Sequence, residues 1–222
     1  MLNIDFLNND YVDNRSAAEK AHERIKIAIL NRELKPGQRL GEQKICEQYG
    51  LSRPPVREII NQLAGEGYIE LIPNRGAFVR EFDNRMIDDI LYMKNLLYPQ
   101  AVRWAIERIT VDEMEILQEV YGFIEFYIPT GDISKIEKFT RGFDAVVYDA
   151  AKNRELEQSL LKYDFITEHA VRMYRYPMNY IENIGSEYKA IFDAFRTRNI
   201  SQGEEAAQVH AFRSMLRIRS RD

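Results

Sequence analysis

The sequence predicts a mainly α-helical fold in two parts: three helices followed by a two-stranded hairpin, and then a longer all-helical bundle. Apolar residues recur at helical spacing along most of the 222-residue chain, whereas strand signals are confined to residues 68–80. The chain is 45% apolar and 30% charged, which is the balance of a globular protein that buries a real core.

The first two helices have clear sequence boundaries. Residues 1–14 show no periodicity and are interpreted as a flexible leader. Apolar residues on one face predict a helix from Ser16 that ends before Pro36-Gly37, a stop signal. A short second helix is predicted over about 42–49, where Gly50 supplies the left-handed residue that ends it.

The third helix begins at Ser52, a favourable N-cap, with Pro54 in the first turn, where a missing N–H costs nothing. Its apolar residues fall on one face and three polar residues, Arg53, Arg57 and Asn61, share the other. Strands are expected at 68–72 and 77–80, joined by the turn Pro73-Asn74-Arg75-Gly76. Residues 15–82 therefore read as a winged helix-turn-helix with a two-stranded wing.

The second part, residues 83–222, contains only helix signals and is expected to be an effector-binding and dimerisation domain. Amphipathic stretches cover about 84–109, 111–127, 132–151, 154–175, 177–198 and 201–219. Capping or helix-breaking residues separate them, namely Thr110, Pro129-Thr130-Gly131, Asn153, Pro177 and residues 199–203.

Composition excludes several classes of protein. A single cysteine, Cys46, rules out an intramolecular disulfide framework and a cysteine-based zinc finger. The first ten residues lack the features of a signal peptide, and no stretch approaches the roughly 18 apolar residues of a membrane span, so we expect a cytoplasmic protein with no membrane partner. The net charge is −4, yet residues 15–80 hold 12 Lys and Arg against 8 Asp and Glu, which favours an anionic partner there.

The third helix and the wing have the arrangement of a double-stranded DNA reader. A helix that carries arginine in its first turn and follows a helix and a tight turn is the geometry that enters the major groove. Arginine pairs bidentately with guanine, while Ser52 and the helix N-terminal amides can hold a phosphate. Arg75 at the wing tip is placed to reach the adjacent groove or backbone.

These features resemble the GntR family of bacterial regulators. The run LKPGQRLGEQKICEQYGLSRPPVREIINQLAGEGYIELIPNRGAFV, residues 34–79, matches that family's signature. The resemblance places DNA contacts at the position of Gln43 in the second helix, where an arginine is often found, and at Ser52, Arg53, Pro54 and Arg57 in the third, with wing contacts at Asn74, Arg75 and Gly76. The residue pattern adds Asn61 to the same face.

The helical part resembles the FCD ligand-binding domain of the FadR branch of that family. The matching segments are Phe143, residues 150–156, Glu187-Tyr188-Lys189-Ala190-Ile191 and Ala207-Gln208-Val209-His210. Many members of the branch bind a divalent metal through an Asp and three His, and the corresponding positions here are Thr140, Asp144, Tyr188 and His210. Thr and Tyr are poor ligands for zinc or nickel. We therefore expect no tightly bound metal and no cofactor, with a weak Asp144/His210 metal site as the alternative.

The same four positions are expected to hydrogen-bond a small organic effector directly. Lys94 and Arg141 could neutralise an acidic group, so the resemblance favours a carboxylate. Each of these residues could instead be a satisfied core or surface residue.

The resulting prediction is a ligand-responsive repressor or activator that binds a pseudo-palindromic operator as a homodimer. Three alternatives remain at this point: an enzyme domain fused to a DNA-binding module, a regulator without an effector, and a winged helix that binds protein. The sequence shows no phosphate loop and no nucleophile motif, and a pair of strongly perturbed carboxylates would favour the enzyme.

Overall fold

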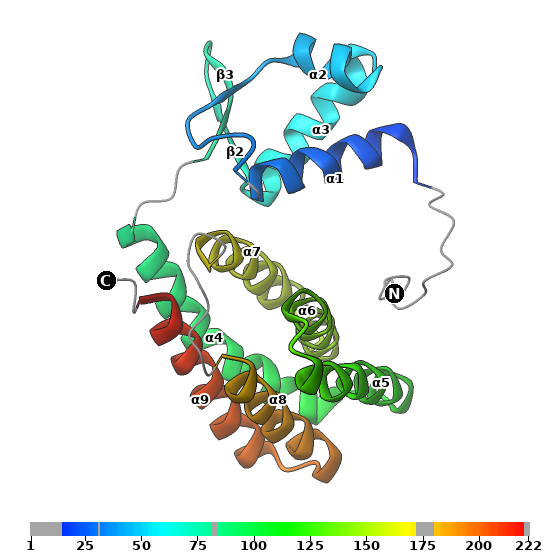
Figure 1. Ribbon diagram of the computed structural model, residues 1–222, viewed down its shortest axis with the longest axis vertical. Coiled ribbons are helices and arrows are strands. Elements are labelled where there is room, and N and C mark those ends of the chain that lie inside the picture. The colour runs from blue at the N-terminus through cyan, green and yellow to red at the C-terminus, as the bar shows by residue number, and fades with distance from the viewer. Residues whose placement is uncertain (1–14, 31, 81–83, 172–179, 220–222) are drawn as a thin grey trace. The chain divides into compact units, whose positions relative to one another are not determined.

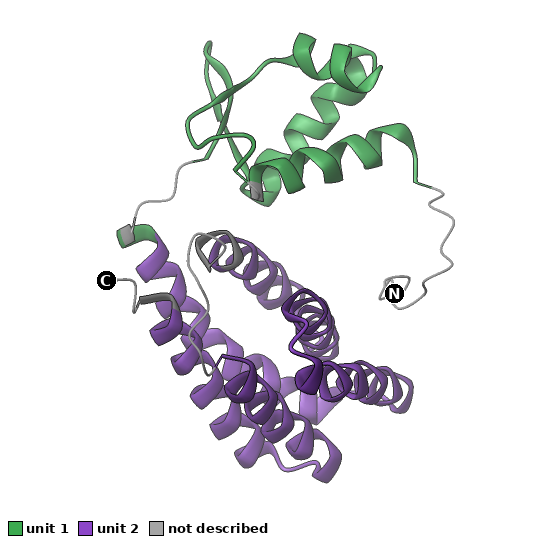
Figure 2. Cartoon of the chain, viewed as in Figure 1, with its two compact units in different colours: residues 1, 3–86 green, residues 2, 87–222 purple. Residues whose placement is uncertain are grey.

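The protein divides into two compact units, and each is described by itself. The computed structural model describes residues 15–30, 32–80, 84–171 and 180–219, so the predicted leader, residues 1–14, lies outside the described residues. The unit boundary falls between Met86 and Ile87, inside the helix that spans Asn84–Arg108 (Figures 1 and 2). The predicted mainly α fold is confirmed.

The N-terminal unit contains α1 (Ala17–Leu30), α2 (Glu42–Tyr49) and α3 (Arg53–Glu66). Their apolar faces meet in a core formed by Ala21, Ile25, Ile29, Ile45, Val56, Ile59, Ile60 and Leu63. Gly50 ends α2 with φ 65°, the left-handed conformation predicted for it. The tight turn that Gly50 starts brings α3 against α2 and leaves the polar side of α3 outward.

The wing has one more strand than the sequence predicted. β1 (Arg39–Leu40) joins β2 (Ile69–Ile72) and β3 (Gly76–Val79) in an antiparallel sheet of order β1-β3-β2. Arg39 pairs with Phe78 and Leu40 with Ala77. A strand of two residues is too short to show an alternating pattern. β1 therefore forms because β3 pairs with it, and its own sequence does not predict it.

The described part of the C-terminal unit is helical, as predicted. Its elements are α4 (Asn84–Arg108), α5 (Val111–Tyr127), η2 (Ile128–Thr130), α6 (Ile133–Ala150), α7 (Arg154–Val171), α8 (Tyr180–Thr197) and α9 (Ile200–Arg219). The predicted cap at Thr110 is confirmed as a capping box with Glu113. The predicted end of one helix at 175 and start of the next at 177 lie outside the described residues. Among the described helices, none is long and apolar enough to cross a membrane.

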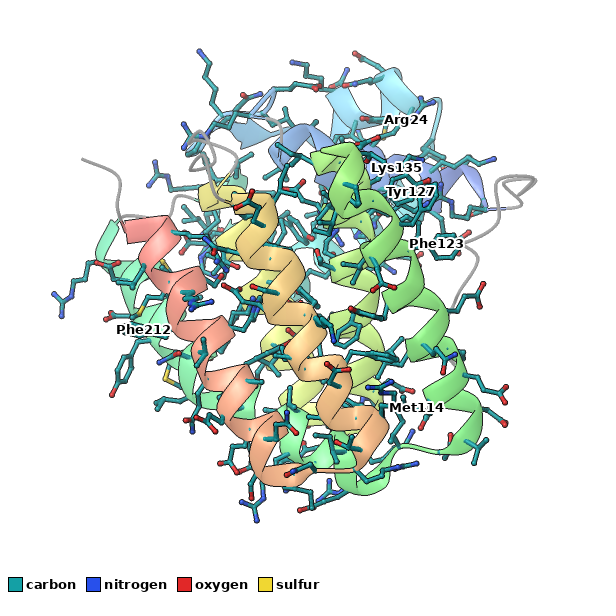
Figure 3. The ribbon with its side chains drawn as sticks, turned by 60° about the horizontal axis from the view of Figure 1, so that its bottom comes forward. Arg24, Met114, Phe123, Tyr127, Lys135 and Phe212 are labelled. Carbon is teal, nitrogen blue, oxygen red and sulfur yellow. The ribbon has the colours of Figure 1, made fainter. Side chains whose placement is uncertain are left out.

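Helices α4 and α9 lie side by side along one flank of the bundle (Figures 1 and 3). A methyl group added at Gly203 would collide with Ile106, so the two backbones approach closely there. Arg103 and Glu204 form an ion pair across the same contact, and further along the rings of Tyr98 and His210 lie 5.4 Å apart. This packing presents polar residues of both helices to one buried centre.

Candidate nucleic-acid interface and buried polar cluster

The outer face of α3 carries the predicted DNA contacts. Arg53, Pro54, Arg57 and Asn61 are all exposed, whereas Val56 and Leu63 on the opposite face are fully buried. Ser52 precedes the helix in an extended conformation, and its side chain makes no capping hydrogen bond. The Ser52 side chain therefore does not satisfy the first amides of α3, and such amides at a helix N-terminus can accept an anion as partner.

Arg57 is held in place by a residue that the sequence analysis did not single out. Its Nε donates to Oε2 of Glu42, at the start of α2, over 3.1 Å. The sequence motif did contain Glu42, two residues after Leu40, but its partner became evident only from the helix packing. Gln43 points to Glu47 at 3.0 Å and is exposed. The Arg57 and Glu42 side chains are 63% and 41% exposed, so this ion pair fixes orientation more than it adds stability.

The wing tip has the expected turn. Asn74 has φ 60° and Gly76 has φ 100°, and the Arg75 amide donates to the Ile72 carbonyl. In this four-residue turn the residue after proline has a positive φ, and Asn tolerates positive φ better than most other side chains. The Arg75 guanidinium lies 5.7 Å from the centre of the Phe78 ring. Asn74, Arg75 and Gly76 are exposed.

Asp144 on α6 forms the centre of the buried polar cluster in the C-terminal unit. Tyr98 of α4 donates to its Oδ1 over 2.9 Å, and Tyr188 of α8 donates to its Oδ2 over 2.8 Å. We call these three residues the Asp144 cluster. Burial and the nearby charge of Asp164 raise the pKa of the Asp144 carboxyl to about 6, against lowering by Lys94 and His210. Burial and the charge of Asp144 raise the pKa of both tyrosines, which therefore stay protonated as donors.

A second carboxylate lies beside the Asp144 cluster. Asp164 of α7 accepts a hydrogen bond from the Tyr148 hydroxyl over 2.8 Å, and its Oδ1 lies 2.5 Å from Lys94 Nζ. Burial alone would lower the pKa of Lys94, but the charges of Asp164 and Asp144 outweigh it and raise that pKa. Lys94 is therefore a charged ammonium that an acid of the chain already neutralises.

Glu187 on α8 is the third buried acid. Arg217 of α9 donates to both of its oxygens at 2.9 Å, and His210 Nδ1 lies 2.8 Å from Oε2. We call Glu187, His210 and Arg217 the Glu187 clamp. Burial favours the protonated acid, but the hydrogen bonds from His210 and Arg217 outweigh it and lower the pKa of Glu187 to about 2. The clamp thus contains a permanent anion.

The structure brings together most of the predicted effector residues. Asp144 and Tyr188 are hydrogen-bonded, and the rings of Tyr188 and His210 lie 5.0 Å apart. Thr140, one turn before Asp144, is buried with its hydroxyl bonded to the Glu137 carbonyl. Arg141 is exposed on α6 and lies outside this buried set. Its role at the effector stays a prediction.

The sequence analysis did not identify several residues of these buried polar groups. These are Tyr98, Tyr148, Asp164, Glu187 and Arg217. Two of them carried a usable signal, since Tyr98 stands one turn after Lys94 and Tyr148 one turn after Asp144, on the same helix faces. The others come from helices whose packing partners the sequence does not specify.

The four positions that correspond to metal ligands are Thr140, Asp144, Tyr188 and His210. Both oxygens of Asp144 accept hydrogen bonds from tyrosines, and the Nδ1 of His210 is engaged by Glu187. Within the part of the chain that the structure describes, no three His, Cys, Asp or Glu side chains form a group that could hold a metal ion. A tyrosine hydroxyl and a threonine bonded to its own helix do not complete such a set. These residues do not fit a zinc or nickel ion.

Comparisons with known proteins agree with this two-part organisation. Residues 17–79 match the family model of bacterial regulatory proteins of the gntR family, and residues 89–213 match that of the FCD domain. The Uncharacterized HTH-type transcriptional regulator YdhC of Bacillus subtilis (strain 168) is 26% identical over 191 residues, which cover 85% of this chain and 83% of the relative. The Galactonate operon transcriptional repressor of Escherichia coli (strain K12) is 24% identical over 213 residues, covering 86% and 92%. Among solved structures, E. coli McbR/YncC shares the fold, with a TM-score of 0.73 and 22% identity over 93% of this chain and 98% of that one.

The raised pKa of Asp144 predicts a specific pH dependence of stability. A carboxyl pKa of about 6 in the fold, above the ordinary 3.8, stabilises the folded state below about pH 4, and this contribution is lost as the pH rises through 6. Asp144→Asn removes the titration. Between pH 4 and pH 7 the free energy of unfolding of the variant should therefore rise relative to wild type, by on the order of 3 kcal/mol. Urea unfolding of both proteins across that range measures it.

The matched control is Asp112→Asn, which removes an exposed carboxylate from the first turn of α5. Its stability should follow the pH profile of wild type. A constant difference between Asp144→Asn and wild type at pH 4 and pH 7 would contradict the assignment of a raised pKa to Asp144.

Proposed function

This chain belongs to the GntR family of bacterial transcription regulators and carries an FCD domain, and from that premise we propose a homodimeric repressor controlled by a hydrogen-bond-donating effector. The protein is a DNA-binding transcription regulator, and its FCD domain is the ligand-binding part. Since it acts on DNA, we place it in the cytoplasm. The single observation that carries the effector proposal is the buried Asp144 with its two tyrosine donors.

We assign operator contacts to the exposed face of α3 and to the wing. Arg53 and Arg57 present guanidinium groups beside Asn61, the side-chain types that read guanine and adenine edges in the major groove. Ser52 and the α3 amides would hold a phosphate, while Pro54 and Gln43 would lie against the DNA backbone. Asn74, Arg75 and Gly76 at the wing tip would contact the neighbouring groove. The exposed cations of this face favour DNA over a protein partner.

Arg53 provides the test of base reading. The test uses a DNA duplex that the wild-type protein enriches from a random pool. Arg53→Gln should weaken binding to this duplex by roughly 10- to 100-fold, or about 1–3 kcal/mol. It should also relax the preference at one base pair of each half-site, because the bidentate pairing is lost. Fluorescence anisotropy on the enriched duplex and its single-base-pair variants measures both effects. Arg24→Gln, an equal charge change on exposed α1, is the control, and equal losses in the two variants would argue against base reading.

The Asp144 cluster is the proposed effector site. Its members come from α4, α6 and α8, with Lys94, Asp164 and His210 beside them, so a ligand that replaced a tyrosine hydroxyl at Asp144 would change contacts of several helices. Such a ligand would shift DNA affinity only if it bound the DNA-competent and DNA-incompetent states with different affinity.

The charge of the buried residues favours a donor-rich effector. Asp144, Asp164 and Glu187 supply three carboxylates, whereas the nearby cations Lys94 and Arg217, whose side chains are 13% and 14% exposed, each already contact one of these acids. A carboxylate ligand would have to displace an existing ion pair to find a cation, at a cost of several kcal/mol. A polyhydroxylated or amino compound would instead donate to Asp144. The carboxylate effector indicated by the family resemblance stays a prediction with less support.

The enzyme alternative has one observation in its favour, since Asp144 has a raised pKa beside a second carboxylate. Three of the four oxygens of these two acids accept a hydrogen bond from Tyr98, Tyr188 or Tyr148, and the fourth, Asp164 Oδ1, is ion-paired with Lys94. Carboxylates engaged in this way are poorly suited to general acid–base chemistry, which needs an oxygen directed at a substrate. We therefore propose binding and not catalysis for this centre.

A ligand panel tests the effector proposal. The thermal unfolding midpoint should rise with a polyol or amino compound, since a bound ligand adds about 2.7 kcal/mol at a hundredfold excess over its Kd. Tyr188→Phe, which deletes one hydroxyl of the Asp144 cluster, should reduce that shift, while Tyr127→Phe on α5, which keeps the ring stacked on Phe139, should not. A shift with dicarboxylates or sugar acids alone would contradict the donor-rich effector. A large shift with zinc or nickel would contradict the metal-free site.

The homodimer is proposed to form through one face of α4 and α9. This α4–α9 face carries six apolar residues that are 42–56% exposed, namely Tyr92, Met93, Leu96, Val209, Phe212 and Leu216. Their spacing places them in one stripe on each helix, and Phe212 is labelled on the flank in Figure 3. An exposed apolar stripe of this size marks an interaction site, and a pseudo-palindromic operator calls for a second copy as the occupant.

The dimer surface can be tested with two matched phenylalanines. Phe212→Asp introduces a charge at the centre of the α4–α9 face and should convert the dimer to monomer. The control, Phe126→Asp, introduces the same charge on α5, where the side chain is 64% exposed, and should leave the dimer intact. Sedimentation velocity gives the mass of each species. If Phe212→Asp sediments as wild type does, the dimer forms elsewhere.

A further inference from the structure

The third strand of the wing adds an arginine to the outer surface of the sheet. Arg39 of β1 stands directly opposite Phe78 of β3, and Leu40 stands opposite Ala77. Directly paired residues of an antiparallel sheet point to the same face. Leu40 and Ala77 are buried, so Arg39 and Phe78 belong to the opposite, outward face. Arg39 is exposed there.

The guanidinium of Arg39 lies across the wing turn. Its Nε and Nη2 are 3.4 Å and 3.5 Å from the position that a Cβ on Gly76 would take. A Cβ at position 76 would touch Arg39 at ordinary van der Waals distance, so the φ of 100°, and not a clash, is what favours glycine there. The turn therefore provides a bare backbone surface on which this guanidinium lies.

Arg75 brings a second guanidinium to the same part of the wing. It lies over Phe78, the direct cross-strand partner of Arg39. Glu70 pairs with Phe78 from the other side, in β2, yet among the described residues neither arginine has a carboxylate within ion-pair distance. Arg57 of α3 differs, because Glu42 holds it. Arg39 and Arg75 thus give this face two cations against the single carboxylate of Glu70, and the excess positive charge attracts an anion.

We propose that Arg39 contacts a DNA phosphate, as the second half of a wing clamp formed with Arg75. The proposal rests on the DNA-binding function. The planar guanidinium matches a phosphate with two parallel N–H donors, and a phosphate contact positions the protein without reading sequence. Arg39 would fix the wing on the DNA backbone while α3 reads base edges.

The salt dependence of binding tests the clamp. Each lost phosphate contact lowers the slope of log Kobs against log salt concentration by about 0.9. Arg39→Gln should therefore lower the slope by about 0.9 per subunit and weaken binding equally on the enriched duplex and on each of its single-base-pair variants. Arg39→Lys keeps the charge and should retain most of the slope. Arg24→Gln, with the same charge change on α1, should leave the slope unchanged.

Three results would overturn the proposal. They are an unchanged slope in Arg39→Gln, the same change in Arg24→Gln, and a loss confined to one base pair, which would identify a base contact. The thermal unfolding midpoint of each variant should match wild type, because both side chains are on the surface. If the wild-type protein itself fails to bind DNA, the DNA-binding function fails, and that result is distinct from a failure of the Arg39 contact.

Discussion

The carboxylate of Asp144 must be supplied with donors because it is buried in a helical bundle, and the arrangement of the C-terminal unit depends on that requirement. A buried charge without partners costs several kcal/mol. Tyr98 and Tyr188 satisfy it from two different helices, and their rings pack against His210. Helices α4, α6, α8 and α9 therefore converge on one polar centre in an otherwise apolar core. Changing the partners of this centre changes how those helices pack.

Helix α4 contributes to three features of the molecule. It follows the winged unit in the chain, it supplies Lys94 and Tyr98 to the buried centre, and it carries half of the proposed dimer face. Pro99 lies within it and removes the hydrogen bond that the Asn95 carbonyl would otherwise accept. This missing hydrogen bond lies next to Tyr98, where the proposed effector would act.

Local sequence determined the features that were predicted, and distant packing determined those that were missed. Gly50 and Thr110 end or begin helices through their own conformation and hydrogen bonds, so they could be read directly. The strand at Arg39 exists only because β3 pairs with it, and its two residues have no pattern of their own. Likewise, the carboxylate that neutralises Lys94 lies 70 positions away on α7, and no spacing rule connects the two.

The two buried acids also differ in how readily a ligand can engage them. Glu187 is fixed as an anion by a bidentate arginine and by His210, and displacing either would leave a buried charge unpaired. Asp144 is bound by neutral hydroxyls, and burial already brings its pKa to about 6. Replacing a neutral tyrosine hydroxyl with a ligand hydroxyl or ammonium group costs far less interaction free energy than breaking an arginine–carboxylate ion pair. The proposed effector is therefore expected to compete with the tyrosines for Asp144. The Glu187 clamp would then hold α8 and α9 together with and without the effector.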